Sequence, residues 1–94
     1  MILSDSSILL AIKKNDIVIE PYDRDCLGTN SYDVHLSRYL ACYLDDVIDA
    51  KKHNKVERFE ISKDGIVLRP GKTYLGSTEE YTETREYVPF LEGK

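Results

Sequence analysis

Ninety-four residues are enough for one modest domain. Thirteen Lys and Arg against seventeen Asp and Glu leave a formal net charge of −4, whereas polynucleotide-binding proteins usually carry a basic surface. The longest apolar run, Ile8 to Ile12, is far too short to cross a bilayer, and the first residues lack the basic stretch of a signal peptide. We therefore expect a cytoplasmic protein with a single domain over residues 1–94 that binds neither polynucleotides nor membranes.

The first element predicted along the chain is a short helix over Ser4–Lys14. Ser4 suits the N-cap position, and Asp5 places a negative charge in the first turn. The β-branched run Ile17–Ile19 then predicts a strand, and Pro21–Asn30 is rich in turn-forming and charged residues, which is typical of a loop.

From Ser31 to Tyr43 apolar and polar residues alternate, and this period of two favours a long strand over a helix. Pro70-Gly71 has the pattern of a type II turn, in which glycine adopts the positive φ at little cost. Three further apolar segments predict strands, and the last of them is expected to be buried: Val56–Ile61, Thr73–Thr78 and Val88–Leu91. Many short strands behind one helix indicate an antiparallel barrel or sandwich.

Few residues point to chemistry by their pattern alone. Cys26 and Cys42 stand too far apart for a zinc motif, and neither His35 nor His53 has a metal-ligand partner at the required spacing, so no metal site is predicted. Without a secretion signal, we expect both thiols to be reduced, although the spacing alone leaves a disulfide open.

Two polar segments allow more than one interpretation. The acidic run with Glu79, Glu80, Glu83 and Glu86 is dense enough for acid–base chemistry, but we interpret it as a solvated face. The Asn30–Asp33 segment could bind a ligand or cap a loop, and its residues alone leave both readings open.

Five segments in order resemble the N-terminal half of the dCTP deaminases, a family of the dUTPase-like superfamily. They are Met1–Asp5 before the helix, Ile17–Pro21, Asn30–Leu36, Leu68–Tyr81 and Val88–Lys94. The resemblance runs through the whole chain with similar spacing.

This resemblance implies a mainly β fold: a distorted antiparallel barrel of the dUTPase-like (β-clip) type with a short N-terminal helix, incomplete in this chain. It also implies a homotrimer with active sites between subunits. The reaction would be hydrolytic deamination of dCTP to dUTP and ammonia in pyrimidine deoxynucleotide metabolism. A glutamate would act as general base, and Mg²⁺ would arrive on the substrate triphosphate, with no zinc.

The resemblance assigns roles to only a few residues here. Lys94 matches the first position of a phosphate-binding motif whose Ser-Ser-x-x-(Gly/Ala)-Arg would follow it, and the catalytic glutamate would lie further on. No catalytic residue is therefore assigned in this chain, which we expect to be inactive alone. Asn30, Ser31 and Asp33 match a segment that organises the site or the trimer contact.

Three alternatives remain open. The protein could be a dUTPase-type nucleotide pyrophosphatase or a bifunctional, dUMP-forming deaminase. It could also be a non-catalytic module for nucleotide binding or oligomerisation, which would bind or assemble without turnover.

Overall fold

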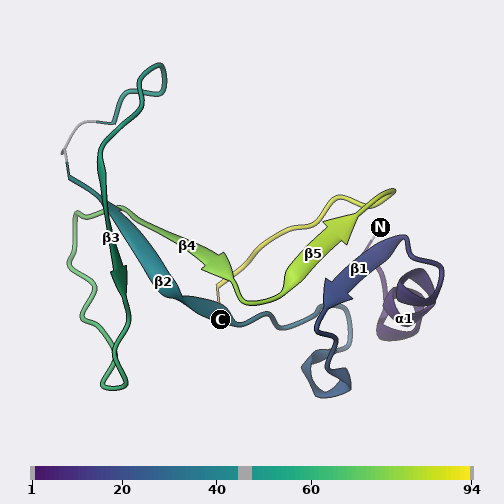
Figure 1. Ribbon diagram of the computed structural model, residues 1–94. Helices are drawn as coiled ribbons and strands as arrows, with labels where there is room; N and C mark the ends of the chain where they lie inside the picture. The colour runs from purple at the N-terminus through teal and green to yellow at the C-terminus, as the bar shows by residue number, and fades with distance from the viewer. Residues whose placement is uncertain (1, 45–47, 94) are drawn as a thin grey trace. The chain divides into compact units, whose positions relative to one another are not determined.

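The computed structural model describes residues 2–44 and 48–93 (Figure 1). Within these residues it has five strands in two antiparallel sheets and one short α-helix, which confirms the mainly antiparallel β prediction. The sheets have two and three strands, and neither closes into a barrel. The elements in chain order are α1 (Asp5–Lys13), β1 (Ile17–Glu20), the 3₁₀ helix η1 (Arg24–Cys26), β2 (Leu36–Tyr43), β3 (Val56–Glu60), β4 (Tyr74–Thr78) and β5 (Tyr81–Thr84).

Close contacts divide the chain into two compact units. The first unit comprises the residues up to His35 together with those from Glu79 onward, and the second is Leu36–Thr78. The single domain expected over residues 1–94 stays a prediction.

In the first unit, α1 packs against β1, and β1 pairs antiparallel with β5. The predicted helix is confirmed to within one residue at each end, and Ser4 is its N-cap, with the Ser4 hydroxyl accepting a hydrogen bond from the amide of Ser7. Ile8 and Ala11 lie on the buried face of α1. This small apolar face explains why so short a helix is held in place, since an isolated helix of this length is marginal in water.

In the second unit, β2 lies between β3 and β4 (Figure 1). Leu40 of β2 is buried, and it lies opposite Phe59 on one side and Gly76 on the other. The ring of Phe59 meets the ring of Tyr74 edge to face, with 6.4 Å between their centroids. Leu40 and these two rings therefore form the apolar centre of this sheet.

The predicted turn at Pro70-Gly71 is confirmed. Gly71 has φ of 80°, as the third residue of a type II turn requires, and the amide of Lys72 donates to the carbonyl of Arg69 at 3.3 Å. This turn leads into β4, so the strand expected over Thr73–Thr78 is confirmed apart from its first residue.

The strand predicted from Ser31 begins later than expected, at Leu36. Before that point Tyr32 forms an isolated antiparallel bridge with Leu27, and the amide of Asp33 donates to the carbonyl of Cys26 at 2.9 Å. The backbone groups of this segment are thus satisfied locally, by the loop before it. Alternation of apolar residues did not reveal this, because a bridge and a strand share the same extended backbone.

The prediction of a buried strand at Val88–Leu91 is wrong for this structure. These residues form no strand, and Val88, Phe90 and Leu91 are almost fully exposed. A strand needs a neighbouring strand for its backbone hydrogen bonds, and none of the described strands pairs with this segment.

The helices of the described chain are also too short and too polar for a transmembrane span.

Candidate functional site

The Asn30–Asp33 segment lies in the first unit, on a loop that folds back on itself. The amide of Gly28 donates to the carbonyl of Ser31 at 2.8 Å, which closes a tight turn around Asn30. The amide of Asp23 donates to the hydroxyl of Tyr32 at 2.8 Å, so the loop is also tied to residues further upstream. Asn30, Ser31 and Asp33 are exposed at its surface. Their predicted role as site-organising residues stays a prediction.

Beside this segment the first unit has a hollow of about 460 Å³. Two tyrosine rings, Tyr22 and Tyr32, stack at its wall with 5.8 Å between their centroids. The other residues around it are mostly charged or titratable: Pro21, Asp23, Arg24, His35, Glu79 and Glu80. The hollow therefore combines an aromatic surface with groups that can donate, accept or exchange protons.

Glu80 is the buried acid of this hollow and is held by His35. The carboxylate of Glu80 accepts from the backbone amide of His35, at 2.9 Å to one oxygen and 3.2 Å to the other. The ring Nδ1 of His35 lies 2.7 Å from Oε2 of the same carboxylate. An ionised carboxylate can only accept, so Nδ1 carries the proton in this bond. The side chain of Glu80 is only 4% exposed, whereas that of His35 is 60% exposed.

The pair shifts both proton equilibria. The hydrogen bond to Glu80, helped by the negative charge of that carboxylate, raises the pKa of His35 above its ordinary value. Burial by itself would raise the pKa of Glu80, but the hydrogen bonds from the ring and amide of His35 outweigh it and lower the pKa. Glu80 is thus stabilised as a carboxylate and His35 as an imidazolium.

The neighbouring Cys26 and Tyr32 are shifted toward their protonated forms. Burial raises the pKa of the Cys26 thiol, and the carboxylates of Asp23, Asp33 and Glu80 raise it further. Burial is also the main cause of the raised pKa of Tyr32. A thiol with a raised pKa is a poor nucleophile, which agrees with the absence of any chemical role for Cys26 in the sequence. Cys26 and Cys42 are both free thiols.

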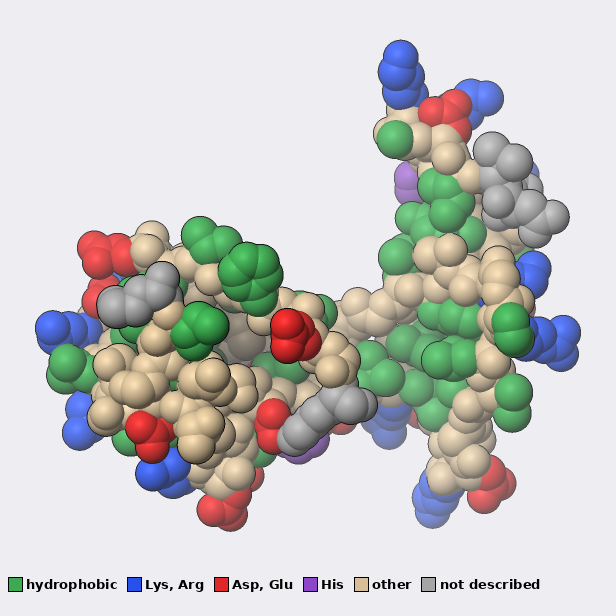
Figure 2. All heavy atoms as spheres, turned by 180° about the vertical axis from the view of Figure 1, so that it is seen from behind, with side chains coloured by type: hydrophobic (Ala, Val, Ile, Leu, Met, Phe, Trp, Pro, Cys, Tyr) green, Lys and Arg blue, Asp and Glu red, His purple; other side chains and the backbone are tan. Residues whose placement is uncertain are grey.

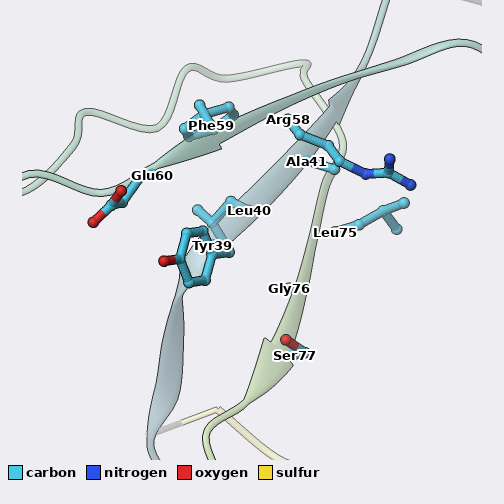
Figure 3. Close-up of a pocket in the computed structure, with 9 residues that line it drawn as sticks. All are labelled: Tyr39, Leu40, Ala41, Arg58, Phe59, Glu60, Leu75, Gly76 and Ser77. Carbon is cyan, nitrogen blue, oxygen red and sulfur yellow. The ribbon is translucent and has the colours of Figure 1, made fainter.

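The second unit has a separate, more open hollow of about 550 Å³ on its sheet (Figure 3). Tyr39, Arg58 and Leu75 come from its three neighbouring strands and surround it. Hydrophobic side chains gather over this unit in Figure 2. Tyr39 and Leu75 are exposed, and no buried titratable group lies in this hollow. It offers apolar contact surface and little that could do chemistry.

The sequence alone does not identify Glu80 and His35 as partners. Glu79, Glu83 and Glu86 are exposed, as the interpretation of the acidic run as a solvated face predicts, but Glu80 is buried. The signal was weak, because one acid in a run of acids looks like its neighbours. His35 likewise shows no partner at a recognisable spacing, since Glu80 lies forty-five positions further along the chain.

Two further predictions about the site concern Lys94 and metal ions. Lys94 lies outside the described residues. Among residues 2–44 and 48–93, His, Cys, Asp and Glu side chains form no group of three or more that could hold a metal ion. The expectation that magnesium arrives with the substrate stays a prediction.

Comparison with known proteins places the chain in a family. A family model described as dCTP deaminase-like matches residues 2–94. The chain is 49% identical over all of its 94 residues to a dCTP deaminase, dUMP-forming, of Clostridium acetobutylicum, of which it covers 54%. Proteins of the same name from Clostridium beijerinckii and Leptospira biflexa are 46% and 45% identical over the same 94 residues, which cover 54% and 53% of their lengths.

The mainly β fold and the match over nearly every residue define the class: this chain belongs to the dCTP deaminase-like family. It spans about half the length of the curated relatives that it matches.

Proposed function

We propose that this chain serves the hydrolytic deamination of dCTP, with dUMP as the final product. The observation that carries the proposal is identity of 45–49% along the whole chain to relatives named dCTP deaminase, dUMP-forming. The resemblance in the sequence implies dUTP as the product, with the dUMP-forming reaction as an alternative. The names of the relatives favour that alternative.

The proposed chemistry has two hydrolytic steps. In the first, water attacks C4 of the cytosine ring, a proton passes to a general base, and ammonia leaves, so that the ring becomes uracil. In the second, water attacks the α-phosphorus and pyrophosphate leaves, which gives dUMP. Magnesium would enter with the triphosphate and offset its negative charge. By resemblance, the general base is a glutamate beyond Lys94.

Within this chain the proposed roles are binding and support. Lys94 would meet a phosphate oxygen as the first residue of the phosphate-binding motif. Asn30, Ser31 and Asp33 would shape the site from the loop of the first unit. Their exposure on a loop with several internal hydrogen bonds supports a role in organising a neighbouring surface.

A homotrimer with sites between subunits is part of the proposal. Its support is the large number of exposed apolar side chains, among them Leu36, Tyr39 and Leu75 of the second unit. Exposed apolar surface of this extent commonly marks a protein interface. Light scattering with size-exclusion chromatography would detect assembly, and a monomer at all concentrations would contradict it.

We further propose that residues 1–94 alone do not turn over dCTP, because the expected catalytic glutamate is not among them. Two measurements test this. Ammonia release from dCTP and Mg²⁺ by the purified 94-residue chain should stay at the level of the buffer. Reading the gene beyond the Lys94 codon should reveal Ser-Ser-x-x-(Gly/Ala)-Arg followed by a glutamate. If neither motif follows, the enzymatic proposal fails.

The product separates the proposal from its alternatives. For the polypeptide that includes those motifs, chromatography of the nucleotides should show dUMP, with pyrophosphate and ammonia in equal amounts. Accumulation of dUTP would indicate a simple deaminase. Hydrolysis of added dUTP without deamination of dCTP would indicate a dUTPase-type pyrophosphatase, and binding without any product would indicate a non-catalytic module.

A further inference from the structure

The chain passes from the first unit to the second at His35–Leu36 and returns at Thr78–Glu79. The residues of the first unit at these two points, His35 and Glu79–Glu80, are joined by hydrogen bonds. The amide of Glu79 donates to the carbonyl of His35 at 2.8 Å, and the carboxylate of Glu80 accepts from both the amide and the ring of His35. We call this set of contacts between His35 and Glu79–Glu80 the clasp.

The carboxylate in the clasp is built into the fold. A buried, ionised carboxylate is costly unless hydrogen bonds and an opposite charge replace its water. Here the amide and the imidazolium of one residue supply both. The described side chains leave no buried nitrogen or oxygen without a hydrogen bond. A solvated acid would need none of this, so Glu80 has a different role from the exposed acids around it.

His35 lies two residues after the Asn30–Asp33 segment, which carries the predicted site residues. Asn30 to Asp33 is tied upstream through the bridge between Leu27 and Tyr32. At its downstream end, two residues after Asp33, the segment meets the carboxylate of Glu80. Glu80 in turn directly precedes β5, which is paired with β1. The clasp thus anchors the downstream end of the loop, directly before β2, to the residues that lead into the paired strand β5.

We propose that Glu80 is a positioning residue which acts through His35 to fix the Asn30–Asp33 segment against the start of β5, and that the strength of this hold depends on pH. The link from this segment to nucleotide turnover rests on the proposed function. The clasp itself does not.

The charged surroundings strengthen the clasp. Besides Glu80, the carboxylates of Glu79 and Asp23 favour the imidazolium of His35, in that order of effect. The other titratable or charged groups near the pair are Arg24 and Tyr32 at the hollow, and Cys26 and Asp33 in the loop. Cys26 and Tyr32 keep their protons at neutral pH, since their pKa values are raised.

The sign of the pH dependence follows from the two shifts. The pKa of His35 is raised, so its contribution is complete below about 6.5, the value in an unfolded chain, and is lost as pH rises through the higher folded value. The pKa of Glu80 is lowered, so its contribution is complete above about 4.3 and is lost as pH falls through the lower folded value. The clasp is therefore strongest between about pH 4.3 and 6.5.

The first experiment compares Glu80→Gln with Glu79→Gln in the 94-residue chain. NMR titration of the His35 ring should show its pKa falling toward the ordinary value in Glu80→Gln. Hydrogen exchange at pH 6 should become roughly tenfold faster for the amides of residues 30–35, as expected when a hydrogen bond to a buried charge is lost. Glu79→Gln is the matched control, because this adjacent acid is exposed and its side chain is outside the clasp. It should lower the pKa of His35 much less and leave exchange unchanged.

A second variant, His35→Asn, keeps a neutral hydrogen-bond donor near the position of Nδ1 and removes the titration. Intrinsic amide exchange accelerates with pH in every variant, so the quantity compared is the protection factor, which is the intrinsic rate divided by the measured rate at the same pH. The protection factors of residues 30–33 should then stay nearly constant from pH 6 to 9, whereas in the unmodified chain they should fall as His35 loses its proton. If circular dichroism shows that Glu80→Gln does not fold, His35→Asn still tests the proposal.

Two results would overturn the proposal: a His35 titration in Glu80→Gln like that in Glu79→Gln, or the same fall of the protection factors with pH in His35→Asn as in the unmodified chain. Neither measurement involves nucleotide. A failure here would thus leave the proposed reaction standing, and a failure to turn over dCTP would leave the clasp standing.

Discussion

Burial separates Glu80 from the acids that surround it in the chain. Glu79 and Glu83 are exposed to water, so their charges cost little free energy in the folded chain. The carboxylate of Glu80 is removed from water and is stabilised by the amide and ring of His35. A charge in such a position constrains the backbone of its partner, which is why one residue of an acidic run can position a distant loop.

Gly76 is a second residue whose role becomes clear only from its neighbours in the sheet. The pairing between β2 and β4 shifts register between Leu36 and Leu40, and both leucines lie over Gly76. A Cβ atom at Gly76 would come within 3.0 Å of Leu36 Cδ1 and 3.1 Å of Leu40 Cδ2. The absence of a side chain therefore allows the shifted register.

We predict that Gly76→Ala destabilises the chain by about 1 kcal/mol, the lower end of the usual cost of overpacking. Leu36 is exposed and can move, but Leu40 is buried and cannot yield freely. Urea denaturation followed by circular dichroism would measure the change. Gly93→Ala is the control, since a Cβ atom there meets nothing within 4 Å and the free energy of unfolding should not change.

At the level of elements, α1 begins at a capped first turn. The hydroxyl of Ser4 accepts from the amide of Ser7 at 3.3 Å and satisfies one of the free amides of the helix start. Asp5 adds a favourable charge at the same end. With nine residues, the helix has few internal hydrogen bonds with which to offset the loss of this cap.

Replacing Ser4 by Ala should therefore cost about 1 kcal/mol, the typical value of an N-cap, and should speed exchange of the first amides of α1. Ser6→Ala serves as the matched control. Ser6 lies inside the same turn and is exposed, and alanine there favours helix slightly. Equal losses for the two variants would show that the cap is not the cause.

At the level of the whole chain, apolar residues fall into two groups with different consequences. Leu40 is 7% exposed and lies at the centre of the three-stranded sheet, whereas Phe90 is 92% exposed and follows the last strand. Burial of apolar surface stabilises a fold, and apolar surface left in water favours association.

This difference predicts different effects for substitutions at the two positions. Leu40→Ala should reduce the free energy of unfolding by about 2 kcal/mol or more, because it leaves a cavity in a small core. Phe90→Ser should change that free energy by less than about 0.5 kcal/mol, as for most surface positions, while it lowers concentration-dependent association in light scattering. A loss of stability in Phe90→Ser similar to that in Leu40→Ala would show that residues 88–91 are packed.

Local patterns in the sequence are enough to predict several of the elements and the family. The cap at Ser4, the β-branched run from Ile17, the turn at Gly71 and the strand of Val56 each follow from local propensities, which act within a few residues. Three features emerge only from the folded chain: β2 begins at Leu36, none of the described strands pairs with Val88–Leu91, and Glu80 is buried against His35. Those outcomes depend on which distant backbone and side-chain groups meet, and local patterns of a few residues do not identify those partners.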